Sequence, residues 1–353
     1  MNVEEINKIR EKNRLLNEQE IKEKKVVLKS KPQNILVILN NTCNLKCIMC
    51  DDYLPSKYII SDDLLESIFN NMVYFNSFSC QGGEPLLYDK FFLVVEKVKD
   101  FKNKFLFTTN GLLLTEEKIK KLQDVEKVHI SISIDGFDKK TYEDIRVNGN
   151  FYLLKENLQI LKYYKNKFKD LTYELMMVPQ KRNYDSIRKA FDFAIENDFS
   201  GIRFLNLVNN TKNNKVCLNN NELDVVKKQI YECIKSKYIN KYNININTDI
   251  NLEQDKLIEC NMNYNDTDIL EHFDNNNVID ICKAPFTNVV IHKFGAISLD
   301  CMCGFDIREK VNSLEEAWNN KYMQQIRKGL IENKPISSCK NCYKDNFFKQ
   351  TNK

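Results

Sequence analysis

The sequence contains no long apolar segment. None of its runs reaches the roughly 18 consecutive apolar residues of a membrane-spanning helix. Residues 1–8 (MNVEEINK) carry charge where a secretory signal would be apolar. We therefore expect a cytoplasmic protein with no membrane partner. In that compartment cysteine thiols stay reduced and are free to bind metal.

Histidine is scarce, and neither sign of charge is in large excess. Three histidines, His129, His272 and His292, form no cluster, and the first and last alternate within strand patterns that are typical of packed or surface side chains. The net charge is only +4, because lysine alternates with acidic residues and asparagine. The basic run at 22–31 lacks the aromatic and glycine residues of an RNA-binding segment, so nucleic acid is not an expected partner.

Cysteine occupies 12 of 353 positions, too few for a disulfide framework. Three cysteines, Cys43, Cys47 and Cys50, share one short loop in the spacing C-x3-C-x2-C. Three thiolates can hold three irons of a [4Fe–4S] cluster and leave the fourth iron open for reaction. A zinc site usually has four ligands, and this loop provides three with no histidine nearby. The loop therefore favours an iron–sulfur cluster.

Strand and helix patterns alternate from residue 35 to residue 207. We predict strands at 35–39, 78–80, 105–107, 128–134, 173–178 and 202–207, and helices at 62–75, 88–101, 116–122, 153–168 and 184–197. Six strands that alternate with helices imply a parallel sheet, whose functional groups gather at the carboxyl ends of the strands. Residues 1–30 predict a charged helix packed on the outside, with a thin apolar stripe of Ile6, Ile9, Leu15 and Leu16.

Two predicted strands end in turns that suit a ligand. Gln81-Gly82-Gly83-Glu84-Pro85 follows one strand, and its glycines let the backbone approach a ligand closely. The alternative for this segment is a tight turn with a helix-capping glutamate. Thr109-Asn110-Gly111 follows the next strand, where an ordinary Asn-Gly turn is the alternative.

The cysteine spacing is the signature of the radical S-adenosylmethionine (SAM) superfamily, which the chain resembles from about residue 34 to residue 342. The resemblance implies a partial (β/α)6 barrel. It implies that SAM chelates the open iron and that the reduced cluster cleaves SAM to methionine and a 5′-deoxyadenosyl radical, which abstracts hydrogen from the substrate. A reductant such as flavodoxin or ferredoxin is implied as well. The residue before the third cluster cysteine is usually aromatic in this superfamily, whereas here it is Met49. Its thioether can still pack on adenine.

The resemblance also assigns residues to SAM. Gly82, Gly83 and Glu84 match the GGEP motif, with the carboxylate accepting from the SAM ammonium group. Gln81 makes the motif similar to that of anaerobic sulfatase-maturating enzymes. Arg146 suits the SAM carboxylate because guanidinium is a planar fork, although a surface salt bridge is the alternative. The other implied SAM-binding residues are Thr109, Asn110, Ser133, Asp135 and, against adenine, Leu205.

A second group of cysteines resembles the auxiliary-cluster domains called SPASM and Twitch. A hairpin pattern at 289–299 and a helix pattern at 313–330 lie between these cysteines. The central cysteine run of full SPASM domains is absent, so the resemblance implies one [4Fe–4S] cluster, held by Cys282, Cys301, Cys339 and Cys342, with Cys303 as the alternative to Cys301. A structural zinc site remains open. The cysteines expected to be small buried apolar residues are Cys80, Cys217, Cys233 and Cys260.

The expected fold is α/β in four parts. These are a helical extension at 1–30, a radical SAM core at 31–211, a connecting region at 212–280 with a helix at 222–237, and a small α+β auxiliary-cluster domain at 281–353.

The expected activity is that of a radical SAM oxidoreductase. We favour oxidation, cross-linking or epimerisation of a ribosomally synthesised peptide, although residues 1–30 are too short for a leader-peptide recognition domain. The alternative substrate is a small sugar-like or other natural-product metabolite, acted on by a dehydrogenase. An iron–sulfur scaffold protein without turnover is a third hypothesis. The sequence identifies no general acid or base and no oligomeric state.

Overall fold

The computed structural model describes residues 1–50, 57–207, 216–250, 252, 282–298, 305–306, 310–334 and 336. The chain divides into two compact units. The first comprises Met1–Ile38, Tyr58–Ser79 and Met262–Lys353, and the second comprises Leu39–Lys57 and Cys80–Asn261. Strand β3 (Ser77–Gln81) crosses this division, because its last two residues belong to the second unit.

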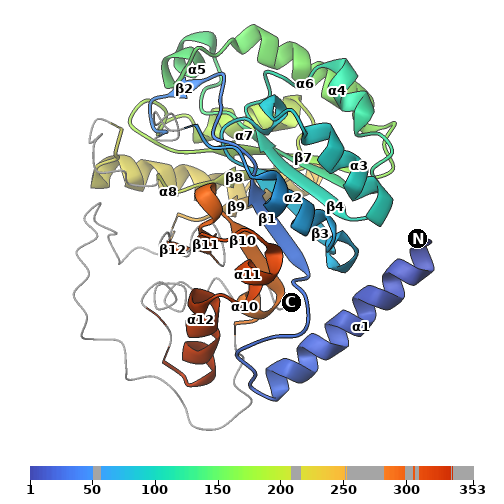
Figure 1. The fold of residues 1–353 in the computed structure, drawn as a ribbon. Helices are drawn as coiled ribbons and strands as arrows, with labels where there is room; N and C mark the ends of the chain where they lie inside the picture. Colours follow the sequence, from blue (N-terminus) through green and yellow to red (C-terminus); the bar gives the residue numbers. More distant parts are fainter. Residues whose placement is uncertain are drawn as a thin grey trace. The chain divides into compact units, whose positions relative to one another are not determined.

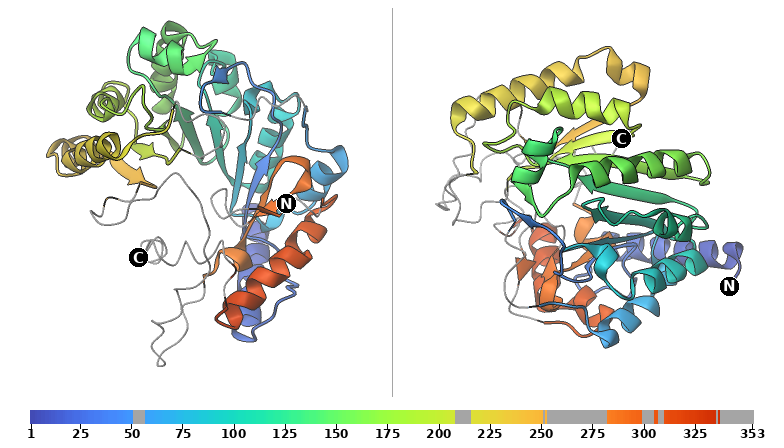
Figure 2. Two further views of the ribbon diagram at one scale, coloured as in Figure 1. Left: turned by 90° about the vertical axis from the view of Figure 1, so that its left-hand side faces the viewer. Right: turned by 90° about the horizontal axis from the view of Figure 1, so that it is seen from above.

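The second unit contains a parallel sheet. Its strands lie in the order β4 (Lys104–Thr109), β5 (Val128–Ser133), β7 (Leu171–Met177), β8 (Gly201–Phe204) and β9 (Asn245–Thr248), and each neighbouring pair is parallel. Helices lie along one side of these strands (Figures 1 and 2), among them α3 (Phe91–Phe101), α4 (Glu116–Lys121), α6 (Phe151–Lys165) and α7 (Ile187–Glu196). The predicted parallel α/β architecture is confirmed.

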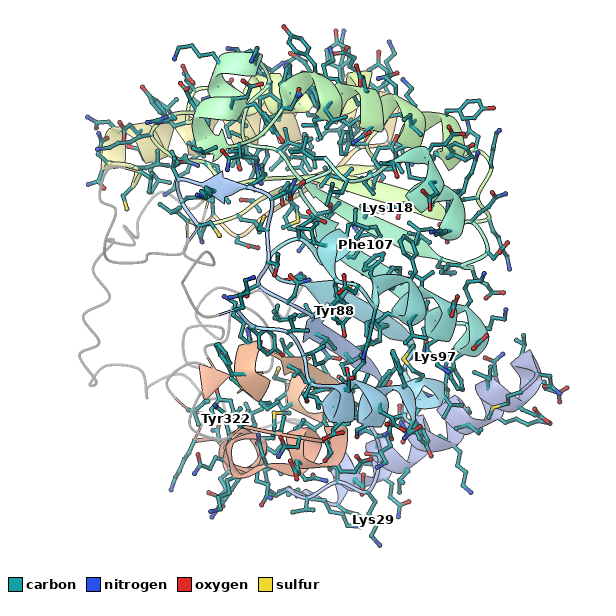
Figure 3. The ribbon with its side chains drawn as sticks, turned by 45° about the horizontal axis from the view of Figure 1, so that its top comes forward. Lys29, Tyr88, Lys97, Phe107, Lys118 and Tyr322 are labelled. Carbon is teal, nitrogen blue, oxygen red and sulfur yellow. The ribbon has the colours of Figure 1, made fainter. Side chains whose placement is uncertain are left out.

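The two faces of this sheet differ in polarity. Phe105 and Phe107 point toward the helices, where their rings lie 5.8 and 5.4 Å from the ring of Phe91 on α3 (Figure 3 labels Phe107). Successive strand residues point to opposite faces, so the residues between the apolar ones lie on the other face. We call this second face the polar face; it carries Thr108, His129, Ser131, Ser133, Thr172, Glu174 and Arg203.

The first unit combines the start of the chain with its C-terminal part. Strand β1 (Asn34–Ile38) pairs in parallel with β10 (Asn288–Ile291), and β10 forms an antiparallel hairpin with β11 (Ile297–Ser298), which pairs with β12 (Phe305–Asp306). The hairpin predicted at 289–299 is therefore confirmed. Its helices are α1 (Val3–Lys22), α2 (Asp62–Phe69), η1 (Met72–Tyr74), α10 (Ala284–Thr287), η3 (Lys293–Gly295), α11 (Leu314–Asn319) and α12 (Lys321–Ile331).

Helix α1 is held by polar side chains, which corrects the predicted apolar stripe. Leu15 is 52% exposed, and of the predicted stripe only Ile6 is fully buried. Asn13 instead exchanges two hydrogen bonds with the backbone of Lys31, at 2.9 and 2.8 Å. The buried Glu20 carboxylate accepts from two further backbone amides of the segment that returns past the helix. Apolar periodicity does not reveal such buried polar positions, because they carry no apolar side chain.

Two helices end or break within the ranges predicted for them. Ser61 caps α2, but the helix ends at Phe69 and a short 3-10 turn follows. The helix predicted at 313–330 is broken at Asn320, whose side chain caps α12. The sequence analysis missed α5 (Lys139–Ile145), α9 (Tyr238–Tyr242) and β9, and α8 (Asn220–Ile234) begins two residues before the predicted helix. Among the described helices, none combines the length and apolar character needed to cross a membrane.

A buried arginine connects distant segments of the first unit. Arg327 on α12 is fully buried and stacks on the ring of Trp318 at 4.3 Å. Burial lowers the pKa of Arg327 to about 9, so the side chain stays charged at neutral pH. Its donors reach the carbonyls of Pro285, Val26 and Trp318 and the side chain of Asn319, at 2.8 to 3.1 Å.

We predict that Arg327→Met lowers the free energy of unfolding by about 3 kcal/mol, because it leaves several buried acceptors without donors. Urea unfolding followed by the fluorescence of Trp318, the single tryptophan of the chain, measures this unit directly. The matched control is Lys328→Met on the same helix, whose side chain is exposed; it should change stability by no more than about 0.5 kcal/mol. Equal midpoints for the two variants would contradict the role given to Arg327.

Candidate functional site

The cysteine loop is fixed by pairing with a distant strand of the second unit. Strand β2 (Lys46–Cys47) pairs antiparallel with β6 (Arg146–Val147), so Cys47 lies opposite Arg146. The amide of Ile48 donates to the carbonyl of Ile145 at 3.0 Å, which extends the pairing. The Nη1 group of Arg146 approaches the sulfur of Cys47 at 3.8 Å. The predicted SAM residue Arg146 is thus a neighbour of the cysteine loop.

The glycine turn contacts the segment just before the first cysteine. Gly82 and Gly83 adopt φ values of 93° and 48°, which favour glycine. A Cβ on Gly83 would lie 2.3 Å from the carbonyl oxygen of Thr42, so no larger residue fits without a shift. The amide of Glu84 donates to the same carbonyl at 2.7 Å. Gly83 therefore serves close packing between two loops, whereas Gly82 is required only by its positive φ.

Glu84 joins this turn to the end of β4. The side chain is fully buried, and its carboxylate accepts from the Thr109 hydroxyl at 2.8 Å, the Asn110 amide at 2.8 Å and the Leu86 amide at 3.2 Å. Burial raises the pKa of Glu84, and the hydrogen bonds from Asn110, Thr109 and Leu86 oppose that rise. The bond to Leu86 caps the short helix η2 (Pro85–Leu87), which is the capping role given as the alternative.

Asn110 continues the connection back to the cysteines. Its Nδ2 group donates to the side chain of Asn44 at 2.8 Å and lies 3.9 Å from the sulfur of Cys43. Its Oδ1 atom accepts from the amide of Leu112 at 3.0 Å. Three predicted SAM-binding residues, Glu84, Thr109 and Asn110, therefore form one network with the cysteine loop.

Asp135 and Arg146 form a buried ion pair. Arg146 Nη2 lies 2.6 Å from Asp135 Oδ2, and the two side chains are 8% and 0% exposed. The other oxygen of Asp135 accepts from the amide of Val178 at 2.8 Å, which ties the pair to the segment after β7. The alternative of a surface salt bridge for Arg146 is wrong, because the pair is buried.

Three predicted SAM residues are placed at or directly after the carboxyl ends of strands. Ser133 is the last residue of β5 and is half-buried. Leu205 directly follows β8, and its amide donates to the carbonyl of Met177 at 2.9 Å. Gln81 ends β3, with its carbonyl accepting from Leu39 at 3.2 Å.

The donor chemistry of the cysteine loop fits an iron–sulfur cluster. Burial raises the pKa of the Cys43 and Cys47 thiols, and the positive charge of Arg146 opposes this rise at both. The sulfur of Cys43 also lies 3.4 Å from the amide of Leu45. Within the described ranges, no three His, Cys, Asp or Glu side chains converge on a single metal ion. A [4Fe–4S] cluster takes one thiolate on each iron, so it does not need such convergence.

The structure describes few of the other cysteines. Cys282 is half-buried just before α10, whereas Cys301, Cys303, Cys339, Cys342 and Cys260 lie outside the described residues. Cys80 and Cys233 are buried as expected, and Cys217 is half-buried. Burial raises the pKa of the Cys80 thiol well above its ordinary value, which makes the thiol inert.

The sequence analysis missed a polar cluster on the polar face. Glu174 on β7 accepts from the hydroxyl of Ser131 on β5 at 2.8 Å and lies 3.2 Å from Arg203 on β8. His129, expected to be packed or at the surface, is 21% exposed and bonds Thr172 at 2.8 Å. The available signal was the polar residue at every second position of otherwise apolar strands.

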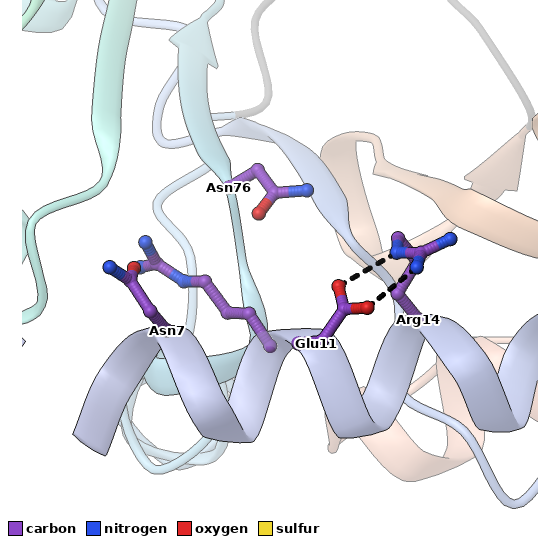
Figure 4. A pocket seen from close by; sticks show the side chains of 5 residues that line it. Asn7, Glu11, Arg14 and Asn76 are labelled. Carbon is purple, nitrogen blue, oxygen red and sulfur yellow. Dashed lines mark hydrogen bonds and ion pairs between the residues drawn. The ribbon is translucent and has the colours of Figure 1, made fainter. Parts of the chain in front are cut away.

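A hollow of about 350 Å³ beside α1 offers no comparable chemistry (Figure 4). It is lined by Asn7, Arg10, Glu11, Arg14 and Asn76. Its charged groups are already engaged: Arg14 pairs with Glu11, and Arg10 donates to the carbonyl of Val73 at 3.1 Å.

Comparison with known proteins identifies the domain that contains this site. Residues 37–194 match the family described as the radical SAM superfamily, which implies SAM and a [4Fe–4S] cluster. The chain is 26% identical over 182 residues to the AdoMet-dependent heme synthase of Methanosarcina barkeri, covering 48% of this chain and 49% of that protein. It is 23% identical over 180 residues to the GTP 3′,8-cyclase of Limosilactobacillus fermentum, covering 48% and 53%. The chain thus spans about half the length of these curated relatives.

Solved structures share the fold. Streptococcus suis SuiB bound to S-adenosylmethionine superposes with a TM-score of 0.62 at 19% identity, covering 89% of this chain and 71% of that one. The structure of anSMEcpe with bound AdoMet gives a TM-score of 0.51 at 22% identity, covering 61% and 64%. At these identities the likeness shows the fold alone.

We predict that Gly83→Ala weakens SAM binding by about tenfold or more, because strain of one to three kcal/mol is expected where a side chain meets the Thr42 carbonyl. Equilibrium dialysis of SAM with the iron-reconstituted protein measures the effect. Gly329→Ala, inside helix α12, is the control and should leave binding unchanged. Unaltered binding in Gly83→Ala would contradict the close contact between the two loops.

Proposed function

Because residues 37–194 of the chain are a radical SAM domain, we propose that the protein is a radical SAM oxidoreductase that oxidises, cross-links or epimerises a ribosomally synthesised peptide. The observation that carries the proposal is the network around the cysteine loop. Arg146 pairs with Cys47 from one side, and Asn110 and Glu84 connect Cys43 to the glycine turn from the other.

Cys43, Cys47 and Cys50 would hold the [4Fe–4S] cluster, and the turn of Gly82 and Gly83 would present its backbone to SAM. When bound, the cluster would supply the electron for reductive cleavage of SAM, and this cleavage would provide the hydrogen-abstracting chemistry. The chain's own contribution is to bring these loops together.

Arg146 has two tasks in this proposal. Its Nη groups are engaged by Asp135 and Cys47, so the guanidinium holds positive charge beside the cysteine sulfurs. Its Nε–H has no hydrogen-bond acceptor among the described residues, which leaves one donor for the SAM carboxylate. Ser133 and Leu205 are the proposed neighbours of the carboxylate and of adenine.

Solved structures that share this fold and contain bound peptides support a peptide substrate. SuiB has been solved bound to its precursor peptide SuiA, with a TM-score of 0.62 to this chain, and anSMEcpe has been solved with bound peptides. At identities of 18% and 22%, these structures show a shared fold but do not establish the substrate of this chain. The experiment below tests the substrate class. A flavodoxin or ferredoxin is the proposed reductant.

We also infer one auxiliary [4Fe–4S] cluster at the C-terminal cysteines. Its proposed ligands are Cys282, Cys301 or Cys303, Cys339 and Cys342. Four thiolates would close its coordination, and a closed cluster serves electron transfer or structure. It could then accept the substrate electron and complete a two-electron oxidation.

The substrate class is tested by anaerobic co-expression with a short peptide encoded beside the gene. We predict that the peptide loses about two hydrogens, or takes up deuterium from heavy water at unchanged chemical composition, as measured by intact mass. The mass change should vanish in Cys47→Ala, which removes one cluster ligand. An unmodified peptide together with SAM cleavage in the wild type would favour a small-metabolite dehydrogenase. Retained SAM cleavage in Cys47→Ala would refute the cluster assignment.

The auxiliary cluster is tested separately by iron content. We predict that Cys342→Ala lowers the iron bound by reconstituted protein by up to one cluster and leaves some SAM cleavage in place. Cys233→Ala is the matched control, because Cys233 is a buried thiol of the other unit and should not change iron content. Unchanged iron in Cys342→Ala would show that the second site is misplaced, and zinc in its place would indicate a structural metal site.

A further inference from the structure

The polar face of the second unit carries a charged cluster that the assignments above do not use. The register of the parallel strands sets Ser131 beside Glu174 and, one layer closer to the carboxyl ends, Met176 beside Arg203. Ser133, proposed as a neighbour of the SAM carboxylate, pairs with that same Met176. Arg203 therefore lies at the level of the SAM residues, and Glu174 lies one layer below it.

One carboxylate oxygen organises the cluster. Glu174 Oε1 accepts from the Ser131 hydroxyl at 2.8 Å, lies 3.2 Å from Arg203 Nε and lies 3.5 Å from His129 Nε2. Thr172 orients His129 through its other ring nitrogen, at 2.8 Å. Burial works to raise the pKa of Glu174, but its contacts with His129, Arg203 and Ser131 outweigh burial and lower that pKa. Glu174 is therefore an ionised anchor.

Arg203 is the exposed member of this buried set. Its side chain is 40% exposed, whereas that of Glu174 is 7% exposed. The Nε atom of the guanidinium lies within ion-pair distance of Glu174, although it forms no hydrogen bond there. Within the described part of the chain, no hydrogen bond or ion pair engages its two Nη groups. Those two groups form a planar fork that matches a carboxylate.

Charge on the five parallel strands is otherwise almost absent. Glu174 is their single acidic residue, and Arg203 and Lys104 are their two permanent cations. Lys104 is the exposed first residue of β4, at the opposite end from the SAM residues. An arginine that only contacts solvent does not need a buried carboxylate to fix its position. Glu174 and the residues of two neighbouring strands fix Arg203, so we interpret Arg203 as a side chain positioned for a ligand.

We propose that Arg203, held by Glu174, Ser131 and His129, binds a carboxylate of the substrate on the polar face of the sheet. The inference rests on the proposed function and narrows it: the favoured substrate is a peptide with an acidic side chain or terminus near its reacting residue. Arg203 is the binding group, and Glu174 is a positioning residue that fixes the direction of the guanidinium fork.

The experiment uses two small probes that differ only in charge, N-acetyl-glutamate amide and N-acetyl-glutamine amide. Their binding to the iron-reconstituted protein with SAM is measured by calorimetry or saturation-transfer NMR. The wild type should prefer the glutamate probe by about tenfold or more, since a charge-assisted bidentate contact contributes roughly 1.5–3 kcal/mol. Arg203→Gln should abolish the preference, and Arg203→Lys, which keeps the charge but loses the fork, should retain part of it.

Arg188→Gln is the matched control. Arg188 lies on the exposed surface of helix α7 and pairs with Asp192, so the preference should persist in this variant. Equal binding of both probes to the wild type would overturn the inference, and so would a preference that survives Arg203→Gln.

These outcomes are separate from those of the proposed function. A modified peptide with no probe preference would refute the role of Arg203 alone. A clear probe preference with no peptide modification would leave the carboxylate site standing and refute the peptide substrate.

Discussion

The buried carboxylate of Glu84 is the interaction on which the candidate site depends. A carboxylate without solvent is costly unless donors surround it, and this one receives a hydroxyl and two backbone amides. Two of these donors belong to the end of β4, and the Glu84 amide is bonded to Thr42 just before the cysteine loop. Satisfying one buried charge therefore fixes the distance between two loops that are far apart in the chain.

A second buried charge works in the same way on the other side of the loop. Arg146 is placed opposite Cys47 by backbone pairing, and Asp135 neutralises it at 2.6 Å. Removing either partner of such a pair leaves an uncompensated buried charge, which costs several kcal/mol. The cysteine loop is thus held between two buried polar groups as well as by the buried side chain of Leu45. The sulfurs of Cys43 and Cys47 lie near N–H donors, which tune the thiolate ligands of a cluster.

The same principle organises the polar face and the N-terminal helix. Glu174 collects Ser131, His129 and Arg203 on three neighbouring strands. Helix α1 is fastened through Asn13 and Glu20, which bond backbone groups of the returning segment. Buried polar side chains in this protein carry the long-range connections, whereas aromatic and aliphatic residues fill the layer between strands and helices.

The sequence alone determined the local features. The spacing of Cys43, Cys47 and Cys50 follows from ligand chemistry, the parallel α/β order follows from period and length, and the two glycines follow from backbone sterics. Only the tertiary structure decided the partners: Arg146 with Asp135 and Cys47, Glu84 with Asn110, and Glu174 with Arg203. These pairs depend on which strands become neighbours and on their register, and a periodic pattern states the face of a strand without naming its neighbour.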